Sequence, residues 1–264
     1  MRDKIIVITG ASAGIGAALA ERVAREGARP VLVARRVVAL HEVAKRIGGE
    51  PFVHVADVTH RSEVEAVVKA VIEKFGRIDV WVNNAGRGIS RLVSQLTDED
   101  IDEMMSVNLK SALYGMQAVL PHFQEREQGH IINVSSMLSR LPMAVFRSAY
   151  SASKHALSAL TANLRMELAS TYPRIFVSSV HPGVVATEFG LNARHGGMDS
   201  RQFPGAQSAE DVASVIAEVI RTPRADVYSR PEARQLVANY FLAEDMGEAE
   251  KNPPFMAFAR PPKV

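Results

Sequence analysis

The sequence predicts an α/β fold in which a doubly wound parallel sheet carries helices on both faces. Three observations support this prediction. Short runs of β-branched and apolar residues alternate with longer stretches of helical periodicity along most of the chain. The first run, Ile5–Thr9, is β-branched throughout, as is typical of a strand buried on both faces. A glycine-rich turn follows it directly and leads into a helical stretch.

The elements alternate in the order that this fold requires. Runs too short for a helix and rich in valine and isoleucine are predicted as strands: Ile5–Thr9, Pro30–Ala34, Phe52–Val55, Ile78–Asn83, His130–Ser135, Ile175–His181 and Asp226–Tyr228. Longer amphipathic stretches are predicted as helices: Ile15–Arg25, Val37–Ile47, Arg61–Phe75, Asp98–Glu127, Ser148–Thr171 and Ala209–Arg221. We expect the longest of them to bend at Pro121, because proline cannot donate the helical hydrogen bond.

No linker interrupts this alternation, so we expect a single domain over residues 1–264, with its core at about 4–230. Residues 187–205 contain several glycines and arginines and are predicted as a loop or substrate lid. A C-terminal extension is expected over 229–264. Within this region, Tyr228–Met246 has the pattern of a strand end, a turn and an amphipathic helix, and the proline-rich Asn252–Val264 is expected to be extended.

The composition argues against several classes of function. Cysteine is absent from the 264 residues, which excludes disulfides, iron–sulfur clusters and cysteine nucleophiles. The histidines lack the spacing of paired metal ligands, so we expect no metal. A net charge of +2 with interleaved acids and bases gives little support to nucleic-acid binding, and no apolar stretch reaches the length of a membrane span. We therefore expect a soluble cytoplasmic protein that binds neither nucleic acid nor membrane.

The glycine-rich turn has the sequence Thr9-Gly10-Ala11-Ser12-Ala13-Gly14-Ile15-Gly16. Glycine lets the backbone approach a pyrophosphate closely, and the N-terminus of the following helix supplies unpaired N–H groups. This pattern predicts a dinucleotide site, and the alternative is a tight turn that uses glycine for positive φ. The same segment contains Gly-x-Ser-x-Gly, the nucleophile elbow of serine hydrolases. A hydrolase elbow follows several strands, whereas this one follows the first, so a hydrolase is the weaker hypothesis.

The end of the second strand bears on the choice of cofactor. A fold that prefers NAD usually places an acid on the adenosine ribose about 20 residues after the glycines. Here the strand ends Ala34-Arg35-Arg36, with no acid and with two guanidinium groups that suit a 2′-phosphate. The sequence predicts NADP(H), with Arg35 at the phosphate and Arg36 pointing along the next helix to solvent. The alternative is a solvated basic pair at a helix start.

Two further motifs carry candidate chemistry. Asn83-Asn84-Ala85-Gly86 follows the fourth strand, and Tyr150 stands four residues before Lys154 near the start of a helix. Residues four apart lie on one helix face. An ammonium group beside a phenol favours the phenolate, so Lys154 is expected to lower the pKa of Tyr150. The alternative for the pair alone is an ordinary surface contact.

Together these residues resemble the short-chain dehydrogenase/reductase family, in its classical branch, over about residues 4–220. The resemblance implies a Rossmann-type fold and an NADP(H)-dependent interconversion of a ketone or aldehyde with an alcohol. The motifs that carry it stand in family order: Thr9–Gly16, Asp57, Asn83–Gly86, Asn108, Ser136, Tyr150, Lys154 and Pro182-Gly183.

The resemblance also implies which residues hold the cofactor. The glycine turn would bind the pyrophosphate, and Asp57 with Val58 would contact the adenine. Asn84, Ala85 and Gly86 would line the adenosine ribose. The nicotinamide end would be contacted by Pro182, Gly183, Val185 and Thr187.

The family's catalytic roles map onto four residues. Tyr150 would exchange a proton with the substrate oxygen, and Ser136 would hydrogen-bond that oxygen. Lys154 would hold the nicotinamide ribose. Asn108 would fix a water that links Lys154 to solvent. Ser136 lies fourteen residues before Tyr150, one more than the family spacing, so Ser135 remains an alternative.

Assembly and substrate are less constrained. The C-terminal region lacks the pattern that supports family tetramers, so we expect a homodimer built from Asp98–Glu127 and Ser148–Thr171, with a tetramer as the alternative. An apolar carbonyl substrate is favoured by the side chains expected to wall the pocket: Met137, Leu138, Leu141, Met143, Phe146 and Leu191. An anionic substrate is favoured by Arg140, Arg147, Arg194 and Arg201. The rival function is a non-catalytic, dinucleotide-sensing regulator, although such proteins typically lack the Tyr/Lys pair.

Overall fold

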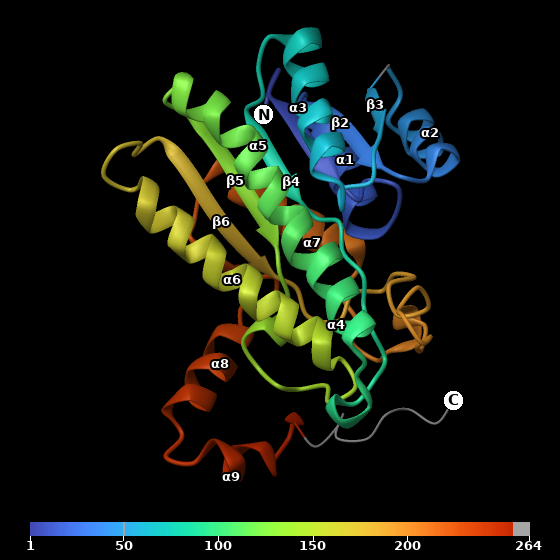
Figure 1. Ribbon diagram of the computed structural model, residues 1–264, viewed down its shortest axis with the longest axis vertical. Helices are drawn as coiled ribbons and strands as arrows, with labels where there is room; N and C mark the ends of the chain where they lie inside the picture. The colour runs from blue at the N-terminus through green and yellow to red at the C-terminus, as the bar shows by residue number, and fades with distance from the viewer. Residues whose placement is uncertain (50, 256–264) are drawn as a thin grey trace.

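Seven parallel strands form the central sheet, in the spatial order β3-β2-β1-β4-β5-β6-β7 (Figure 1). The computed structural model of the protein describes residues 1–49 and 51–255. In chain order the strands are β1 Ile5–Thr9, β2 Arg29–Ala34, β3 Phe52–Val55, β4 Val80–Asn83, β5 Gly129–Val134, β6 Ile175–His181 and β7 Asp226–Tyr228. Each strand begins and ends within two residues of its predicted range, and the doubly wound parallel sheet is confirmed.

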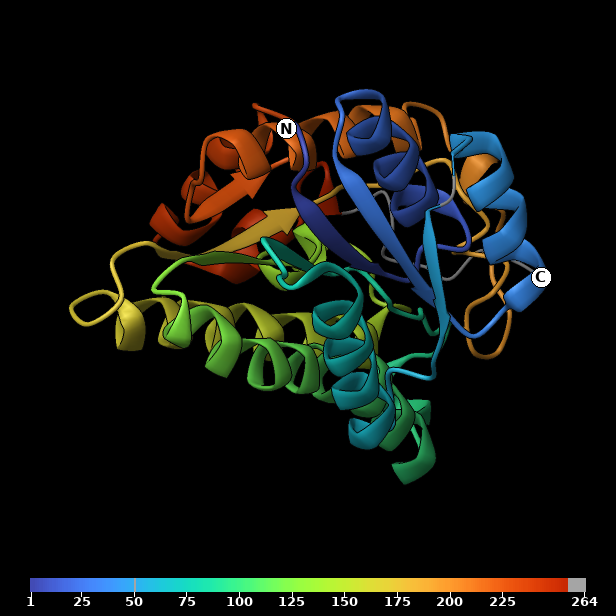
Figure 2. The same cartoon turned by 90° about the horizontal axis from the view of Figure 1, so that it is seen from above.

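Helices cover both faces of this sheet (Figure 2). One face carries α1 Gly14–Arg25, α2 Val37–Ile47 and α7 Ala209–Arg221. The other carries α3 Arg61–Phe75, α5 Ser111–Glu125 and α6 Ser148–Leu168. Two apolar cores result, one on each side of the strands.

The first strand shows why its sequence is apolar at every position. Ile6 and Ile8 pack into the core beneath α1 and α7, whereas Ile5 and Val7 pack into the core beneath α3 and α5. Successive strand side chains point to opposite faces, so a strand covered on both sides has no position left for a polar residue.

The strand order reverses between β1 and β4, which are neighbours in the sheet but not in the sequence. From β1 the chain continues to β2 on one side, and from β4 it continues to β5 on the other side. A crevice forms where these two connections diverge, at the carboxyl ends of the strands. The fold therefore brings the glycine turn after β1 beside the residues that follow β4.

The longest helical stretch departs from its prediction. It consists of α4 Asp98–Met105, a π-helical turn over Ser106–Lys110, and α5, which contains Pro121. The break in the α-helical pattern therefore lies at Ser106–Lys110, whereas α5 continues through Pro121 to Glu125. A π turn inserts an extra residue, and such turns are frequent at functional sites.

The chain after β7 forms α8 Ala233–Leu242 and the short α9 Met246–Glu250, so the predicted helix of this region is confirmed. The tail expected to be extended over Asn252–Val264 lies outside the described residues beyond residue 255. Short 3₁₀ turns occur at Val93–Gln95, Met137–Ser139 and Ser200–Gln202. None of the helices within residues 1–49 and 51–255 has the length and apolar character needed to cross a membrane.

Candidate active site

A cavity of about 1420 Å³ lies at the carboxyl ends of the strands, where the crevice was expected. Most of the residues predicted to hold the cofactor line it: Gly10, Ser12, Ala13, Gly14, Ile15, Arg35, Arg36, Asp57, Val58, Asn84, Ala85, Gly86, Tyr150, Lys154, Pro182, Gly183, Val185 and Thr187. Ser136 also lines the cavity, whereas Thr9, Gly16 and Asn108 do not. Thr9, Gly16 and Asn108 are buried behind the residues that line the cavity.

The glycine turn needs glycine for two separate reasons. Gly10 and Gly14 adopt φ values of 67° and 53°, in the left-handed region that favours glycine. Gly16 lacks space for a side chain, because a Cβ there would lie 2.4 Å from the carbonyl oxygen of Gly10. The start of α1 is thereby packed against the turn, and its first residues, Gly14 and Ile15, line the cavity.

Thr9 and Asn84 join the ends of β1 and β4. The Thr9 hydroxyl accepts hydrogen bonds from the backbone N–H groups of Asn84 (3.0 Å) and Ala85 (3.1 Å). The Asn84 side chain in turn donates to the carbonyl oxygen of Thr9 at 2.9 Å. These side-chain hydrogen bonds connect the two strands beyond the point where their backbone pairing ends, and they fix this part of the cavity.

The two arginines after β2 both line the cavity, but they differ from their predicted orientations. Arg35 donates to the Asp57 carboxylate at 3.3 Å, with its side chain 70% exposed. Arg36 does not point along α2 to solvent. Its Nε and Nη2 donate to the hydroxyl of Ser12 at 3.3 and 3.1 Å, so it turns back onto the glycine turn. Asp57 also accepts from the N–H of Thr59 at 3.0 Å, which fixes the turn after β3.

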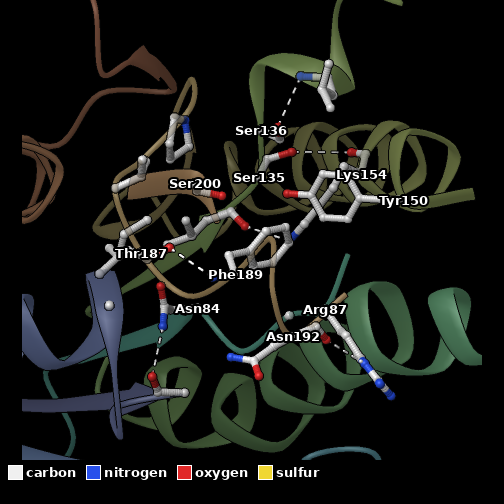
Figure 3. A pocket seen from close by; sticks show the side chains of 18 of the residues that line it. Asn84, Arg87, Ser135, Ser136, Tyr150, Lys154, Thr187, Phe189, Asn192 and Ser200 are labelled. Atoms are coloured by element: carbon white, nitrogen blue, oxygen red, sulfur yellow. Dashed lines mark hydrogen bonds between the residues drawn. The ribbon is translucent and has the colours of Figure 1, made fainter. Parts of the chain in front are cut away.

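Tyr150 and Lys154 project from one face of α6 into the other end of the cavity, beside Ser136 (Figure 3). Both are buried, with 8% and 3% of their surface exposed. Lys154 donates to the carbonyl oxygen of Val134 at 2.9 Å, and its Nζ lies 5.9 Å from the centre of the Tyr150 ring.

Burial sets the proton affinities of this pair. It raises the pKa of Tyr150, although the neighbouring Ser136 hydroxyl and the positive charge of Arg147 act in the opposite direction. Burial also lowers the pKa of Lys154 to about 8. Lys154 is not among the groups that lower the pKa of Tyr150 here, and the lowering expected from its ammonium group stays a prediction. Desolvation of the phenolate outweighs the nearby charges, and Tyr150 is held as the neutral phenol.

Ser135 and Ser136 point in different directions. The Ser136 side chain lies beside the phenol of Tyr150 (Figure 3), and its hydroxyl accepts a hydrogen bond from the N–H of Leu138 at 3.1 Å. The Ser135 hydroxyl donates to the carbonyl oxygen of Lys154 at 3.3 Å and is bonded to Ser158 at 3.0 Å. Ser136 thus faces Tyr150, whereas Ser135 ties β5 to α6.

Asn108 occupies the middle of the π turn. Its Oδ1 accepts from the N–H of Arg87 at 2.9 Å, and its Nδ2 donates to the carbonyl oxygen of Arg87 at 3.0 Å. A Cβ on Gly86 would lie 3.0 Å from Asn108 Oδ1 and 3.6 Å from Lys154 Nζ. Asn108 is therefore close to Lys154 but is occupied in holding the strand-like segment after β4.

Two functional candidates, Phe189 and His181, were not assigned a role by sequence reasoning. Phe189 packs edge-on against Tyr150, with ring centres 5.4 Å apart. His181 lies directly before Pro182, and its Nε2 is 2.8 Å from the carboxylate of Asp226. Its Nδ1 is 3.0 Å from the hydroxyl of Ser139, and this hydroxyl donates to the carbonyl oxygen of Ser136. The sequence could have pointed to His181, because this residue ends the predicted strand Ile175–His181 and directly precedes the Pro-Gly turn. Phe189 carried no such signal beyond its place in the predicted lid.

The predicted pocket wall is confirmed in part. Met137, Leu138, Met143 and Phe146 line the cavity, whereas Leu141 is buried in the core and Leu191 is 48% exposed. Of the four arginines suggested for an anionic group, Arg147 lines the cavity and the others do not.

Comparison with known proteins agrees with this geometry. The family model described as short chain dehydrogenase matches residues 4–196. An uncharacterized oxidoreductase of Staphylococcus epidermidis is 40% identical over 187 residues, which cover 71% of this chain and 80% of that protein.

Two solved structures are similar over most of their length. An alcohol dehydrogenase from the archaeon Thermococcus sibiricus, complexed with 5-hydroxy-NADP, has a TM-score of 0.74 and 32% identity, covering 86% of this chain and 95% of that one. A short-chain dehydrogenase/reductase from Burkholderia phymatum, in complex with NAD, has a TM-score of 0.83 and 26% identity, covering 96% of each chain. With its sheet order, glycine turn and Tyr/Lys helix, the chain belongs to the short-chain dehydrogenase/reductase family of oxidoreductases.

Proposed function

We propose that the protein is an NADP(H)-dependent oxidoreductase that interconverts a ketone or aldehyde with an alcohol, with Tyr150 as the acid and base. One observation carries the proposal. A buried phenol that lies beside Ser136 and shares a helix face with Lys154 stands at one end of a cavity whose other end is a glycine turn (Figure 3).

The residues present fit a nicotinamide dinucleotide. Gly14 borders the cavity without a side chain, and a Cβ at this position would lie 3.2 Å from the side chain of Thr187, which also borders it. The glycine turn would hold the pyrophosphate, and Lys154 would hold the nicotinamide ribose. When bound, the cofactor supplies or accepts the hydride at the carbonyl carbon.

The chain's own residues handle the proton and the charge. In the reducing direction, Tyr150 donates its phenolic proton to the carbonyl oxygen as negative charge develops there. The phenol carries this proton at neutral pH, since the ordinary pKa of tyrosine is about 10 and burial raises it further. Ser136 donates a hydrogen bond to the same oxygen, and a donor already aimed at the developing charge acts without reorganisation. The ammonium of Lys154 stabilises the phenolate that remains, and Asn108 holds the adjoining backbone.

The segment 187–205 is proposed as the lid that closes over the substrate. Its Phe189 already packs on Tyr150, and Thr187 borders the cavity. Closing such a segment excludes water, which strengthens every charge interaction at the carbonyl oxygen.

NADP(H) is favoured over NAD(H) by the residues at the adenosine end. Ala34 presents no carboxylate to repel a 2′-phosphate, and Arg35 and Arg36 both border that end of the cavity. The two related structures described above hold an NADP derivative and NAD respectively, so family membership alone leaves the choice open.

Two rival functions are less well supported. A dinucleotide-sensing regulator has no need of the buried Tyr/Lys pair that this chain retains. A serine hydrolase would need a base at Ser12. Instead Ser12 accepts from Arg36, and within residues 1–49 and 51–255 no histidine is hydrogen-bonded to it.

The test is cofactor turnover with a panel of ketones, aldehydes and alcohols, measured by nicotinamide absorbance with NADPH and NADH in parallel. Oxidation of NADPH that depends on a carbonyl compound supports the proposal. Binding of cofactor without turnover of any panel member favours the regulator, and hydrolysis of an activated ester favours the hydrolase.

We further propose a homodimer that pairs α5 and α6 with the same helices of a second copy. Leu157 and Leu168 of α6 are buried within the chain, but Leu160 and Leu164 are only partly buried and Met166 is 75% exposed. Light scattering after size exclusion should give twice the chain mass of 28.8 kDa. A monomer at micromolar concentration would refute this assembly.

A further inference from the structure

Arg147 differs from the other arginines that border the Tyr150 end of the cavity. Arg87 is ion-paired with Glu103, and Arg230 lies 3.8 Å from Glu232. Arg147 has no carboxylate within salt-bridge distance anywhere in the described part of the chain. A partly buried guanidinium without a counter-ion is costly, so its retention beside a cavity points to a ligand.

The other arginines suggested for an anionic group are already neutralised. Arg140 pairs with Asp226 at 2.7 Å, Arg194 with Asp100 at 2.5 Å, and Arg201 with Asp199 at 2.8 Å. None of the three lines the cavity. The structure thus reduces four candidates to one.

The hydrogen bonds of Arg147 leave one edge of its guanidinium available. Nη1 donates to the carbonyl oxygen of Ile89 at 3.0 Å and to the Ser90 hydroxyl at 3.2 Å. Nε and Nη2 have no acceptor among residues 1–49 and 51–255. These two nitrogens form the side-on fork with which arginine binds both oxygens of a carboxylate.

Glycines make room around this side chain. A Cβ on Gly88 would lie 3.0 Å from Nη1, and a Cβ on Gly197 would lie 3.3 Å from Nη2. The first glycine belongs to the segment after β4 and the second to the lid. Arg147 therefore sits between the body of the protein and the lid, where a bound anion would contact both.

The local field favours an anion as well. Arg147 is the N-cap residue of α6, whose first turn contains no acidic residue. The amino end of a helix carries a partial positive charge that a cation at the N-cap reinforces. Among the carboxylates that border the cavity, each is paired with an arginine except Asp102, which is exposed on α4; the paired ones are Asp57, Glu103, Glu188 and Glu232.

We propose that the substrate carries a carboxylate in addition to its carbonyl group, and that the Nε–Nη2 edge of Arg147 binds this carboxylate. The inference rests on the proposed reductase function and narrows it to oxo acids and hydroxy acids. Tyr150 follows Arg147 by three residues on the same helix start, so a molecule held by both has its carbonyl oxygen positioned at the phenol. Arg147 is then a specificity-determining residue.

The experiment compares oxo acids with their uncharged methyl esters. The probes are 3-oxobutanoate, 4-oxopentanoate and 5-oxohexanoate, each with its ester, reduced with NADPH. Wild type should prefer at least one acid over its ester. In Arg147→Gln, kcat/KM for that acid should fall by on the order of tenfold to a hundredfold, mainly through KM, with the ester changed by less than about threefold. Arg147→Lys keeps the positive charge but loses the two-nitrogen fork, so its kcat/KM for the acid should lie between the values of wild type and Arg147→Gln.

The matched control is Arg174→Gln, which removes the same charge from a surface ion pair with Glu127 outside the cavity and should change kcat/KM for neither substrate. Equal use of acid and ester by wild type would overturn the inference and leave the reductase function standing. An equal loss for both substrates, with a shifted pH profile in each, would overturn it too, because Arg147 would then act on the pKa of Tyr150. If wild type turns over no carbonyl compound at all, the proposed function itself fails.

Discussion

Arg194 of the lid donates a hydrogen bond of 2.5 Å to Asp100 of α4, ninety-four residues earlier in the chain. The Asp100 side chain has no exposed surface and also contacts Arg91 at 3.2 Å and His195 at 2.7 Å. These bonds and the capping box with Thr97 hold the pKa of Asp100 well below its usual range, although burial alone would raise it. A buried carboxylate therefore anchors the lid to α4.

The first prediction is that Asp100→Asn loosens the lid. Removing one partner of a buried ion pair costs on the order of 3 kcal/mol. We expect a lower denaturation midpoint and faster proteolysis within residues 187–205. Asp98→Asn, at an exposed position of the same helix turn, is the control and should leave both nearly unchanged. Equal protease resistance in wild type and Asp100→Asn would show that other contacts hold the lid.

The second prediction concerns acid stability at Asp226. The hydrogen bond with His181 lowers the pKa of Asp226 to about 2, from 3.8. A carboxylate with a lowered pKa stabilises the fold above its unfolded pKa and loses that contribution as pH falls through the folded value. The contribution is about 1–2 kcal/mol after allowing for partial exposure.

Denaturant unfolding of wild type and Asp226→Asn from pH 7 to pH 2 tests this. The stability difference should be constant above about pH 5 and should shrink between pH 4 and pH 2. A difference that is independent of pH over this range would mean that the loss comes from packing and not from the charge.

The third prediction is a preference for NADPH in which Arg36 contributes more than Arg35. Arg35 faces the carboxylate of Asp57, which offsets its charge, whereas the partner of Arg36 is the neutral hydroxyl of Ser12. A guanidinium–phosphate bond is worth ~1.5–3 kcal/mol, or roughly tenfold to a hundredfold in kcat/KM.

The ratio of kcat/KM for NADPH and NADH should therefore fall most in Arg36→Ala, less in Arg35→Ala, and should invert in Ala34→Asp. Added salt should weaken the preference, because the site is partly exposed. Equal use of both cofactors by wild type would refute the NADP(H) assignment. A loss confined to Arg35→Ala would restore the assignment made from the sequence.

Much of the fold was readable from the sequence because its signals are local. The unbroken β-branched run Ile5–Thr9 and the glycine turn fix a strand, a turn and a helix start without reference to the rest of the chain. The Tyr150 and Lys154 pair was readable for the same reason, since helical spacing alone puts both on one face.

The remaining features depend on partners that are distant in the sequence. The role of Asp100 follows from Arg194, and the orientation of Arg36 follows from Ser12 in the glycine turn after β1. The π turn at Asn108 coincides with two hydrogen bonds to the backbone of Arg87, a partner that helical periodicity does not reveal. The raised pKa of Tyr150 reflects burial, which spacing on a helix does not reveal.

The fourth prediction separates the two adjacent serines. Ser136→Ala should lower kcat on the order of a hundredfold, because it removes a donor aimed at the developing negative charge. Ser135→Ala should lower kcat by less than tenfold, since its hydroxyl bonds to α6 and faces away from Tyr150. The comparison uses whichever carbonyl compound the panel identifies. A larger loss in Ser135→Ala would mean that the extra residue of this loop lies before Ser136.

The proton-transfer role of Tyr150 is tested most directly by measuring turnover and cofactor binding together in Tyr150→Phe. The phenylalanine ring fills the same buried space but has no proton to give, so turnover should fall by at least about a hundredfold. The dissociation constant for NADPH, measured by fluorescence titration, should change by less than about threefold. Tyr114→Phe, at a tyrosine that contacts Arg61 outside the cavity, is the matched control and should behave as wild type. Turnover retained in Tyr150→Phe, with cofactor binding intact, would contradict the mechanism.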